Sequence, residues 1–427
     1  MVSKQNLSVV IDLGTSKLVA LAGKLTETGK MEILGLAKIP SKGIKRGVVF
    51  NIEEAAEAIT ALLEKLDEQL EDEIHTVDVA LAGSKMRTVD YKCSTLTSGE
   101  GFVTARDVEA LTEEARHVTI QQDYKVVKVI PTSYIIDDEN EVEKPVGSTG
   151  RKIDANFKLV VVPEVYISNL KIVLEKVNVE LGEIIHASIA VSEAVLTTEE
   201  KEVGVIIADF GAGTTNLAVY QDNVLKHTAV VPFGGQVVSN DIKEGCSIFL
   251  KKAELLKVKY GQAMGDFADD RKVVTIAGEN GWEPRDISFK SLAYIIQARL
   301  EEIIECVSTE IQRSGIEENL GSGIVITGGT SNLENIISLV KFKTAMDARK
   351  AHAVVHPVNR REEFQDKEML TALGALKLVL SSTNPAPVST SGRIKKNKER
   401  RFAPLFKDVV QGALNLFDTE NSDAELN

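Results

Sequence analysis

The chain opens with two short apolar runs separated by a polar turn. Residues 7–12 and 17–25 are rich in β-branched and aliphatic side chains, and a Gly-Thr-Ser turn lies between them. Two such runs around a glycine-containing turn predict a β-hairpin. After Asn51, apolar residues recur at every third or fourth position as far as Leu70. This spacing predicts a helix with Asn51 as its N-cap.

The next part of the chain mixes the two kinds of pattern. Residues 106–118 have helical spacing, whereas the runs at 77–81, 125–136 and 157–162 are strand-like. A polar loop rich in glycine and charged residues is expected at 137–152. Strands and helices that alternate in this way indicate an α/β protein.

The opening pattern then occurs a second time. A strand, an Asp, a glycine turn and a strand follow each other again, with Asp209-Phe-Gly in place of Asp12-Leu-Gly. A long amphipathic helix is expected at 291–311, followed by a buried strand at 323–327 that ends in Gly-Gly. Asn332 is the expected N-cap of the helix after that strand. The repeated unit predicts two related halves.

The organisation changes after residue 380. Residues 381–401 lack periodicity, are rich first in Ser, Thr and Pro and then in Lys and Arg, and predict a flexible basic linker. On a helical wheel of residues 402–417, the apolar side chains fall in one half, namely Phe402, Leu405, Phe406, Val409, Val410, Ala413, Leu414 and Phe417. The basic residues before them are Lys395, Lys396, Lys398, Arg400 and Arg401.

Cations beside an apolar face predict an amphipathic helix that lies in an anionic membrane lipid surface. The alternative is a helix that docks on the protein's own core. An acidic tail follows at 418–427.

Composition narrows the classes of function. The 427 residues are 43% hydrophobic and 26% charged, which is ordinary for a globular protein with several buried cores. The net charge of −13 repels a phosphate backbone, so no nucleic-acid partner is expected. The 3 cysteines lie far apart, which predicts a reducing compartment, and neither a signal peptide nor a membrane span is predicted. We therefore expect a cytoplasmic protein of several domains.

The two Asp-x-Gly hairpins are the strongest candidates for chemistry. Residues 12–17 are Asp-Leu-Gly-Thr-Ser-Lys, and residues 209–216 are Asp-Phe-Gly-Ala-Gly-Thr-Thr-Asn. Small residues let a tight turn aim successive backbone N–H groups outward, which makes an anion-binding concavity. An Asp at the strand end can hold Mg²⁺ directly or through water. One copy alone is typical of an ordinary hairpin, but two copies that face each other predict a clamp on a nucleotide triphosphate.

With these motifs the chain resembles the actin-like ATPase superfamily, which includes actin, sugar kinases and heat-shock chaperone ATPases. Within it, the stretches IDLGTSK, VPFGGQVVSNDI, AELLKVKYG and VITGGTSNLENI and the basic amphipathic end are similar to the FtsA family of bacterial cell-division proteins. The resemblance covers essentially the whole chain, in family order. It implies an α/β, actin-like fold of two halves with duplicated ribonuclease-H-like cores, an inserted FtsA-type subdomain and a C-terminal amphipathic helix.

The resemblance also implies how the chain is divided. The first-half core is expected at 1–83 and 164–198, the inserted subdomain at 84–163, the second-half core at 199–235 and 303–380, and a second-half subdomain at 236–302. The last of these would be the side that binds FtsZ, the tubulin-like partner of the family.

Carried over by motif, the resemblance implies a site for ATP with Mg²⁺. The residues implied to contact the nucleotide are Gly14, Thr15, Ser16, Lys17, Gly211, Gly213, Thr214, Thr215, Asn216, Gly234, Gly235, Glu254, Lys257, Gly328, Gly329 and Thr330. Asp12 and Asp209 are implied to hold Mg²⁺ through water. Arg299 is implied to contact the C-terminal peptide of FtsZ, and a solvated arginine on a helix face is the alternative.

The function implied is that of a cell-division adaptor. It would bind ATP, polymerise like actin, and tether FtsZ filaments to the cytoplasmic face of the cell membrane at the division septum, where it recruits later divisome proteins. Ala187 stands where heat-shock chaperones carry a glutamate that positions the attacking water, so at most weak ATPase activity is expected. A PilM-like pilus-assembly adaptor and a chaperone-type ATPase are the alternatives.

Overall fold

The computed structural model describes residues 7–99, 101–277, 283–316 and 320–383. The basic linker beyond Thr383, the amphipathic helix at 402–417 and the acidic tail lie outside the described residues. In the part that is described, no helix is long and apolar enough to cross a membrane.

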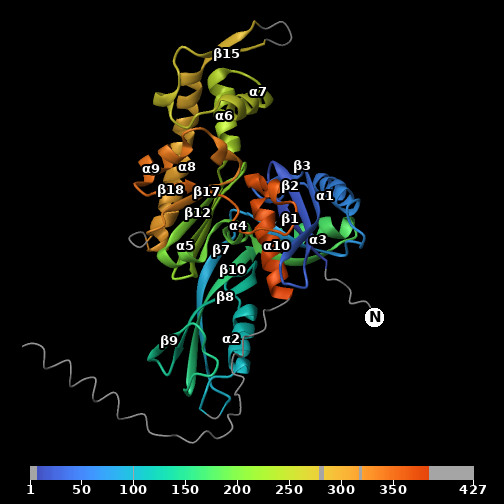
Figure 1. Cartoon of the computed structure of the whole chain (residues 1–427), viewed down its shortest axis with the longest axis vertical. Helices are drawn as coiled ribbons and strands as arrows, with labels where there is room; N and C mark the ends of the chain where they lie inside the picture. Colours follow the sequence, from blue (N-terminus) through green and yellow to red (C-terminus); the bar gives the residue numbers. More distant parts are fainter. Residues whose placement is uncertain (1–6, 100, 278–282, 317–319, 384–427) are drawn as a thin grey trace, which may run out of the picture. The chain divides into compact units, whose positions relative to one another are not determined.

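The first half is built on a five-stranded sheet (Figure 1). Its strands are β1 (Ser8–Leu13), β2 (Lys17–Leu25), β3 (Met31–Pro40), β6 (Thr76–Leu81) and β11 (Glu180–His186), in the order β3-β2-β1-β6-β11. The first three strands form an antiparallel meander, while β6 and β11 run parallel to β1. The hairpin predicted from the opening apolar runs is therefore confirmed.

Both faces of this sheet are covered by helices. Alternate residues of β1 point to opposite faces, so that Val9 and Ile11 pack with α1 (Ile52–Asp67) and α3 (Glu164–Lys176). Asn51 is the N-cap of α1, and its side chain accepts hydrogen bonds from the backbone N–H groups of the first turn, as its sequence position predicts. A short hairpin of β4 (Ile44–Lys45) and β5 (Val48–Val49) precedes α1.

The second half repeats this sheet with the same strand order. Its strands are β12 (Val205–Phe210), β13 (Thr215–Gln221), β14 (Val224–Val231), β17 (Ile324–Thr327) and β18 (Ala348–Lys350), in the order β14-β13-β12-β17-β18. Again three antiparallel strands are followed by two parallel ones. The prediction of two related halves is confirmed, because β1 and β12 occupy the same place in two sheets of the same topology.

A separate sheet is inserted into the first half. Its strands are β7 (Arg87–Leu96), β8 (Tyr124–Ile136), β9 (Asn140–Val142) and β10 (Lys152–Pro163), in the order β7-β10-β8-β9, with α2 (Ala105–His117) packed on it. They share a small core of their own, in which the rings of Tyr134 and Phe157 meet edge to face. The loop expected at 137–152 contains β9, a short strand that pairs with the end of β8.

The second half carries its own helical layer. It consists of α5 (Thr198–Val203), α6 (Gly235–Cys246), α7 (Leu250–Tyr260), α8 (Phe289–Ser314) and α9 (Ile336–Thr344), with a hairpin of β15 (Val273–Ile276) and β16 (Arg285–Ser288). The helix expected at 291–311 is α8.

The prediction that Asn332 caps the following helix is wrong. Asn332 ends a short 3-10 helix, η3 (Gly329–Asn332), and α9 begins after Asn335. Glu334 pairs with Gln262 in an isolated β-bridge, so the backbone stays extended beyond Asn332 before it turns into the helix.

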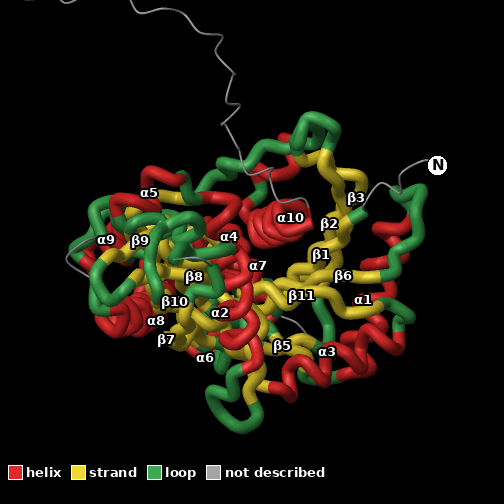
Figure 2. Tube along the Cα trace, turned by 90° about the horizontal axis from the view of Figure 1, so that it is seen from below, coloured by secondary structure: helices red, strands yellow, loops and turns green. Residues whose placement is uncertain are grey.

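Two helices pass between the halves. α4 (Ala187–Val195) packs with α10 (Leu370–Thr383) in one apolar core that draws residues from both large sheets. Figure 2 shows α10 beside β1 and β2, although the sequence analysis counted residues up to 380 as part of the second half. The crossing is close because Gly374 has no Cβ, which would collide with the backbone carbonyl of Ala190.

Candidate functional site

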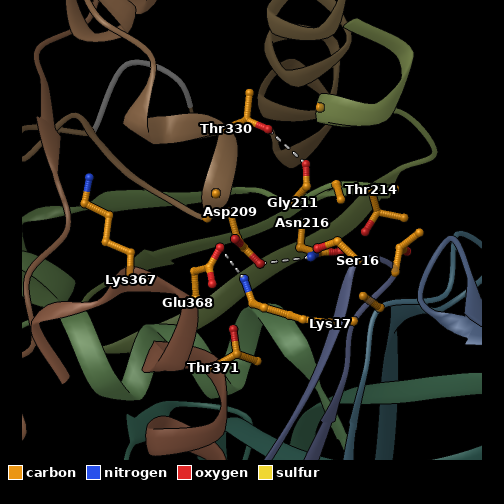
Figure 3. Close-up of a pocket in the computed structure, with 18 of the residues that line it drawn as sticks. Ser16, Lys17, Asp209, Gly211, Thr214, Asn216, Thr330, Lys367, Glu368 and Thr371 are labelled. Atoms are coloured by element: carbon orange, nitrogen blue, oxygen red, sulfur yellow. Dashed lines mark hydrogen bonds and ion pairs between the residues drawn. The ribbon is translucent and has the colours of Figure 1, made fainter. Parts of the chain in front are cut away.

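A cavity of about 280 Å³ lies where the two repeated hairpin turns meet (Figure 3). It receives residues from the β1–β2 turn, the β12–β13 turn, α6, α7 and the segment after β17. Most of the residues implied by the sequence line it, namely Asp12, Gly14, Thr15, Ser16, Lys17, Asp209, Gly211, Gly213, Thr214, Asn216, Gly235, Glu254, Lys257, Gly328, Gly329 and Thr330.

The two hairpin turns are built alike. A Cβ on Gly14 would run into the backbone carbonyl of Lys17, and a Cβ on Gly211 would run into that of Thr214. Each glycine therefore lets its turn close tightly, three residues before the carbonyl that it approaches. A Cβ on Gly213 would meet the side chain of Thr15, so the turns of the two halves also touch each other.

One carboxylate from each half lies at the inner end of the cavity. Burial raises the pKa of Asp12 to about 7, with a further contribution from Asp209, while the Lys17 ammonium opposes the shift. Burial also raises the pKa of Asp209, although Asn216 and Lys17 act in the other direction. Asn216 Nδ2 donates a hydrogen bond of 3.1 Å to Asp209 Oδ2. Two carboxylates that resist ionisation in one cavity are suited to a bound cation, which would stabilise their charged forms.

A second cluster is formed by α6 and α7. Lys257 Nζ donates to Glu254 Oε2 and to the backbone carbonyl of Gly235, both at 2.8 Å. Glu254 also accepts a hydrogen bond from Ser239. Burial lowers the pKa of Lys257, and its ion pair with Glu254 opposes this effect. The pair is fixed to the start of α6 and presents its polar atoms to the cavity.

The Gly-Gly sequence after β17 forms another wall. Gly328 has a φ of 83°, and a Cβ there would strike Asp209 and the backbone of Phe210. Gly329 is exposed, and the nearest atom to a Cβ on it would be Glu368 Oε1 at 3.7 Å. Thr330 Oγ1 donates a hydrogen bond of 3.1 Å to the carbonyl of Gly211, which ties this wall to the second hairpin turn. The space in front of Gly329 is therefore open to a flat ligand.

Three of the implied residues are not among the described residues that line the cavity. Thr215 is buried beneath it, and its Oγ1 donates a hydrogen bond of 2.9 Å to the carbonyl of Phe233. Gly234 packs against the backbone of Gly211 and Ala212. Arg299 lies on α8, where its guanidinium binds Asp241 and Glu302.

The sequence analysis did not include the residues just before α10. Lys367, Glu368 and Thr371 line the cavity, and Glu368 Oε1 lies 3.1 Å from Lys17 Nζ. Lys367 Nζ lies 3.3 Å from Asn332 Oδ1. The stretch shows neither a glycine motif nor periodicity, so no local signal marks these residues.

The donors and acceptors of the cavity fit a nucleotide polyphosphate with a divalent cation. Lys17 supplies a cation beside two turns of small residues, and Asp12 and Asp209 supply carboxylate oxygens. Asn216 Oδ1 is buried and lacks a hydrogen-bond partner within the described part of the chain, so a polar ligand or its water shell would satisfy it.

Comparison with known proteins gives the family. The family model described as "Cell division protein FtsA" matches residues 206–374, and that described as "SHS2 domain inserted in FTSA" matches residues 83–161. Cell division protein FtsA of Pseudomonas aeruginosa is 32% identical over 340 residues, covering 80% of this chain and 81% of that protein. The chain belongs to the FtsA family.

More distant members of the family agree. Cell division protein FtsA of Escherichia coli (strain K12) is 30% identical over 339 residues, which cover 78% of this chain and 80% of that protein. The protein of the same name from Bacillus subtilis is 29% identical over 342 residues, or 79% of this chain and 77% of the relative. The match to the inserted domain spans the sheet of β7, β8, β9 and β10.

Solved structures show the actin-like fold. The PilM-PilN type IV pilus biogenesis complex contains a chain of TM-score 0.61 and 15% identity, with 88% of this chain and 99% of that chain covered. MreB5 of Spiroplasma citri, in a structure bound to ADP, has a TM-score of 0.53 and 14% identity, with coverage of 89% and 99%. The likeness to PilM is one of fold, so the FtsA family replaces the pilus-assembly and chaperone alternatives.

Proposed function

We propose that this FtsA-family protein binds ATP with Mg²⁺ between its two halves and acts as an adaptor that tethers FtsZ filaments to the cytoplasmic face of the membrane at the division septum. The observation that carries the nucleotide part is the cavity itself. Two turns of the same construction, one from each half, face each other there and bring Lys17, Asp12 and Asp209 together. The MreB5 structures of this fold bound to ADP and to AMPPNP support the same kind of ligand.

The residues divide the work of holding the nucleotide. The small residues of the two hairpin turns and the Lys17 ammonium would bind the phosphates, and Asp12 and Asp209 would hold Mg²⁺ through its water shell. Glu254 and Lys257 would orient the ribose, and the open space at Gly329 would receive the adenine. Bound Mg²⁺ supplies charge neutralisation for the phosphates.

Slow hydrolysis is part of the proposal. Ala187 lines the cavity at the start of α4, and a methyl group can neither accept a proton nor orient a water molecule. Catalysis of phosphoryl transfer depends mostly on positioning and electrostatics, so losing the group that orients water removes part of the rate. ATP would then act mainly as a ligand that favours the closed, polymer-forming arrangement of the two halves.

The adaptor role adds two attachments to this nucleotide-binding body. The amphipathic sequence at 402–417 would bind anionic lipid, and the second-half subdomain that carries Arg299 would bind the C-terminal peptide of FtsZ. A single helix of this length binds lipid weakly, whereas an actin-like filament places many copies on one surface. Polymerisation would therefore convert weak binding into stable attachment, to which later divisome proteins are recruited.

One sedimentation experiment tests the adaptor role. The protein, purified FtsZ and liposomes with anionic lipid are mixed with and without Mg-ATP, and the amount of FtsZ that pellets with the liposomes is measured. We expect FtsZ to pellet only when the protein is present, and more strongly with Mg-ATP. FtsZ that stays in the supernatant under all conditions would contradict the proposal, whereas equal pelleting without nucleotide would contradict only the role of ATP.

A further inference from the structure

Lys17, the only cation in the first hairpin turn, is already engaged by an acidic residue of the same cavity. Its Nζ lies 3.1 Å from Glu368 Oε1, and the two side chains point toward each other in Figure 3. Their exposed fractions are 18% for Lys17 and 29% for Glu368, so the pair is partly shielded from water. An ion pair of this kind is stronger than one on the open surface.

Glu368 has a second cation within reach. Its other carboxylate oxygen contacts Lys38 Nζ on β3, and Lys38 also lies 3.1 Å from Asp366 Oδ2. Burial alone would raise the pKa of Glu368, but the hydrogen bond from Lys38 and the charge of Lys17 outweigh it and lower that pKa. Glu368 is therefore an anion held between two lysines, one of which lies in the cavity.

The backbone holds Glu368 in this place. Asn359 binds the edge of β3 through two hydrogen bonds with the backbone of Ile33, of 3.0 and 2.9 Å, so the chain before η5 (Lys367–Met369) follows the first-half sheet. Asp366 then caps η5 by accepting a hydrogen bond of 3.0 Å from the Glu368 backbone N–H. Lys17 and Glu368 thus sit on the same half, and their contact does not depend on closure between the halves.

We propose that Glu368 competes with the phosphates of the bound nucleotide for Lys17, and so sets a limit on the affinity for polyphosphates. The inference rests on the proposed function, because it needs a phosphate ligand in this cavity. When phosphate binds, Lys17 exchanges a carboxylate for a phosphate oxygen, and Glu368 keeps Lys38 as its partner. Part of the attraction between Lys17 and phosphate is thereby spent on breaking an existing ion pair.

The isosteric variant Glu368→Gln removes the negative charge and little else. We expect its Kd for Mg-ATP, measured by calorimetry, to fall about three- to tenfold, the range that separates a partly shielded ion pair from a neutral contact. Binding of adenosine, which has no phosphate, should change less than twofold. Thermal unfolding checks that the variant is folded.

Asp366→Asn is the matched control. It removes a charge of the same network, keeps the cap of η5, and does not touch Lys17 or line the cavity. Its affinity for Mg-ATP should stay within twofold of the wild-type value. An equal gain in both variants would overturn the proposal in favour of a general effect of net charge, and weaker ATP binding in Glu368→Gln would overturn it by making Glu368 a support for Lys17.

A measurement without nucleotide tests the ion pair itself. The rate at which an amine-reactive ester labels Lys17, followed by mass spectrometry, should rise in Glu368→Gln and stay unchanged in Asp366→Asn. An unchanged rate in both variants would overturn the inference. If wild type does not bind Mg-ATP, the proposed function fails together with the inference; if wild type binds it with the same Kd as Glu368→Gln, only the inference fails.

Discussion

Arg299 on α8 binds both carboxylate oxygens of Asp241 on α6. Arg299 Nε lies 2.5 Å from Asp241 Oδ2, and Nη2 lies 3.1 Å from Oδ1. Glu302, one turn further along α8, takes the remaining side of the guanidinium. Hydrogen bonds to Asp241 raise the pKa of Arg299. The residue expected to contact FtsZ is therefore also a link between two helices, and its two roles have to be separated by experiment.

We expect Arg299→Ala to weaken binding of an FtsZ C-terminal peptide at least fivefold in a fluorescence titration. It should also lower the free energy of unfolding by about 1–2 kcal/mol, because a two-point ion pair between α6 and α8 is lost. Asp241→Asn is the companion variant, since it weakens the link but keeps the cation. Peptide affinity that stays at the wild-type level in Arg299→Ala, despite the lower stability, would assign Arg299 to helix packing alone.

Gly329→Trp should abolish nucleotide binding. The indole would fill the space in front of Gly329, where the nearest atom to a Cβ lies 3.7 Å away, and would exclude the adenine. Binding of a fluorescent ATP analogue measures the effect. Thr28→Trp, at an exposed position outside the residues that line the cavity, controls for the added tryptophan. Wild-type affinity in Gly329→Trp would remove this wall from the proposed site.

ATP turnover should be slow. Ala187 offers no group that orients the attacking water, so we expect a rate below about 1 s⁻¹, the lower end of the range common for kinases. Release of phosphate at saturating Mg-ATP measures it, with Lys17→Met as the background control. A turnover of about 1–100 s⁻¹ would refute the argument from Ala187, and it would require another residue to orient the water.

The amphipathic sequence at 402–417 should carry the attachment to lipid. Phe406→Glu puts a charge on the apolar half of the helical wheel, whereas Asn415→Glu puts the same charge on the polar half. We expect Phe406→Glu, and deletion from Arg400 onward, to abolish flotation with anionic liposomes without changing the affinity for ATP. Asn415→Glu should still float. Flotation of Phe406→Glu at the wild-type level would place the tether elsewhere.

His186 should make the stability of the fold sensitive to acid. It is buried at the N-cap of α4, where Nδ1 accepts a hydrogen bond from the Ser188 backbone N–H, and burial lowers its pKa from 6.5 to about 4. The unfolded chain therefore takes up a proton below about pH 6.5 that the folded chain refuses until about pH 4. Stability is present above pH 6.5 and is lost as the pH falls through this window.

The variant His186→Asn isolates this effect, because Asn is also a good N-cap but does not titrate. Between pH 7.5 and 4.5, wild type should lose about 2 kcal/mol more of its free energy of unfolding than the variant does. Urea unfolding at the two pH values measures the difference. Parallel losses in the two proteins would mean that His186 is protonated in the folded state or exposed to water.

The sequence by itself determined the features that depend on local pattern. The alternation of apolar residues gave the strands of both hairpins, and the spacing after Asn51 gave α1 with its cap, because burial of one face and satisfaction of the first N–H groups are local requirements. The glycines of the two turns were recognisable for the same reason, since a tight turn needs them wherever it occurs. The repeat of the Asp-x-Gly hairpin was enough to predict two related halves.

Only the tertiary structure decided which residues complete the cavity. Lys367 and Glu368 follow a stretch without periodicity, and they reach Lys17 because Asn359 pairs with β3 and guides the chain along the first-half sheet. Ion pairs between such distant positions leave no repeating pattern in the sequence, because any polar residue satisfies the local rules there. The passage of α10 into the first half was hidden for a related reason. Its apolar residues show that the helix is buried, but the surface that buries it is chosen by the fit of Gly374 against α4.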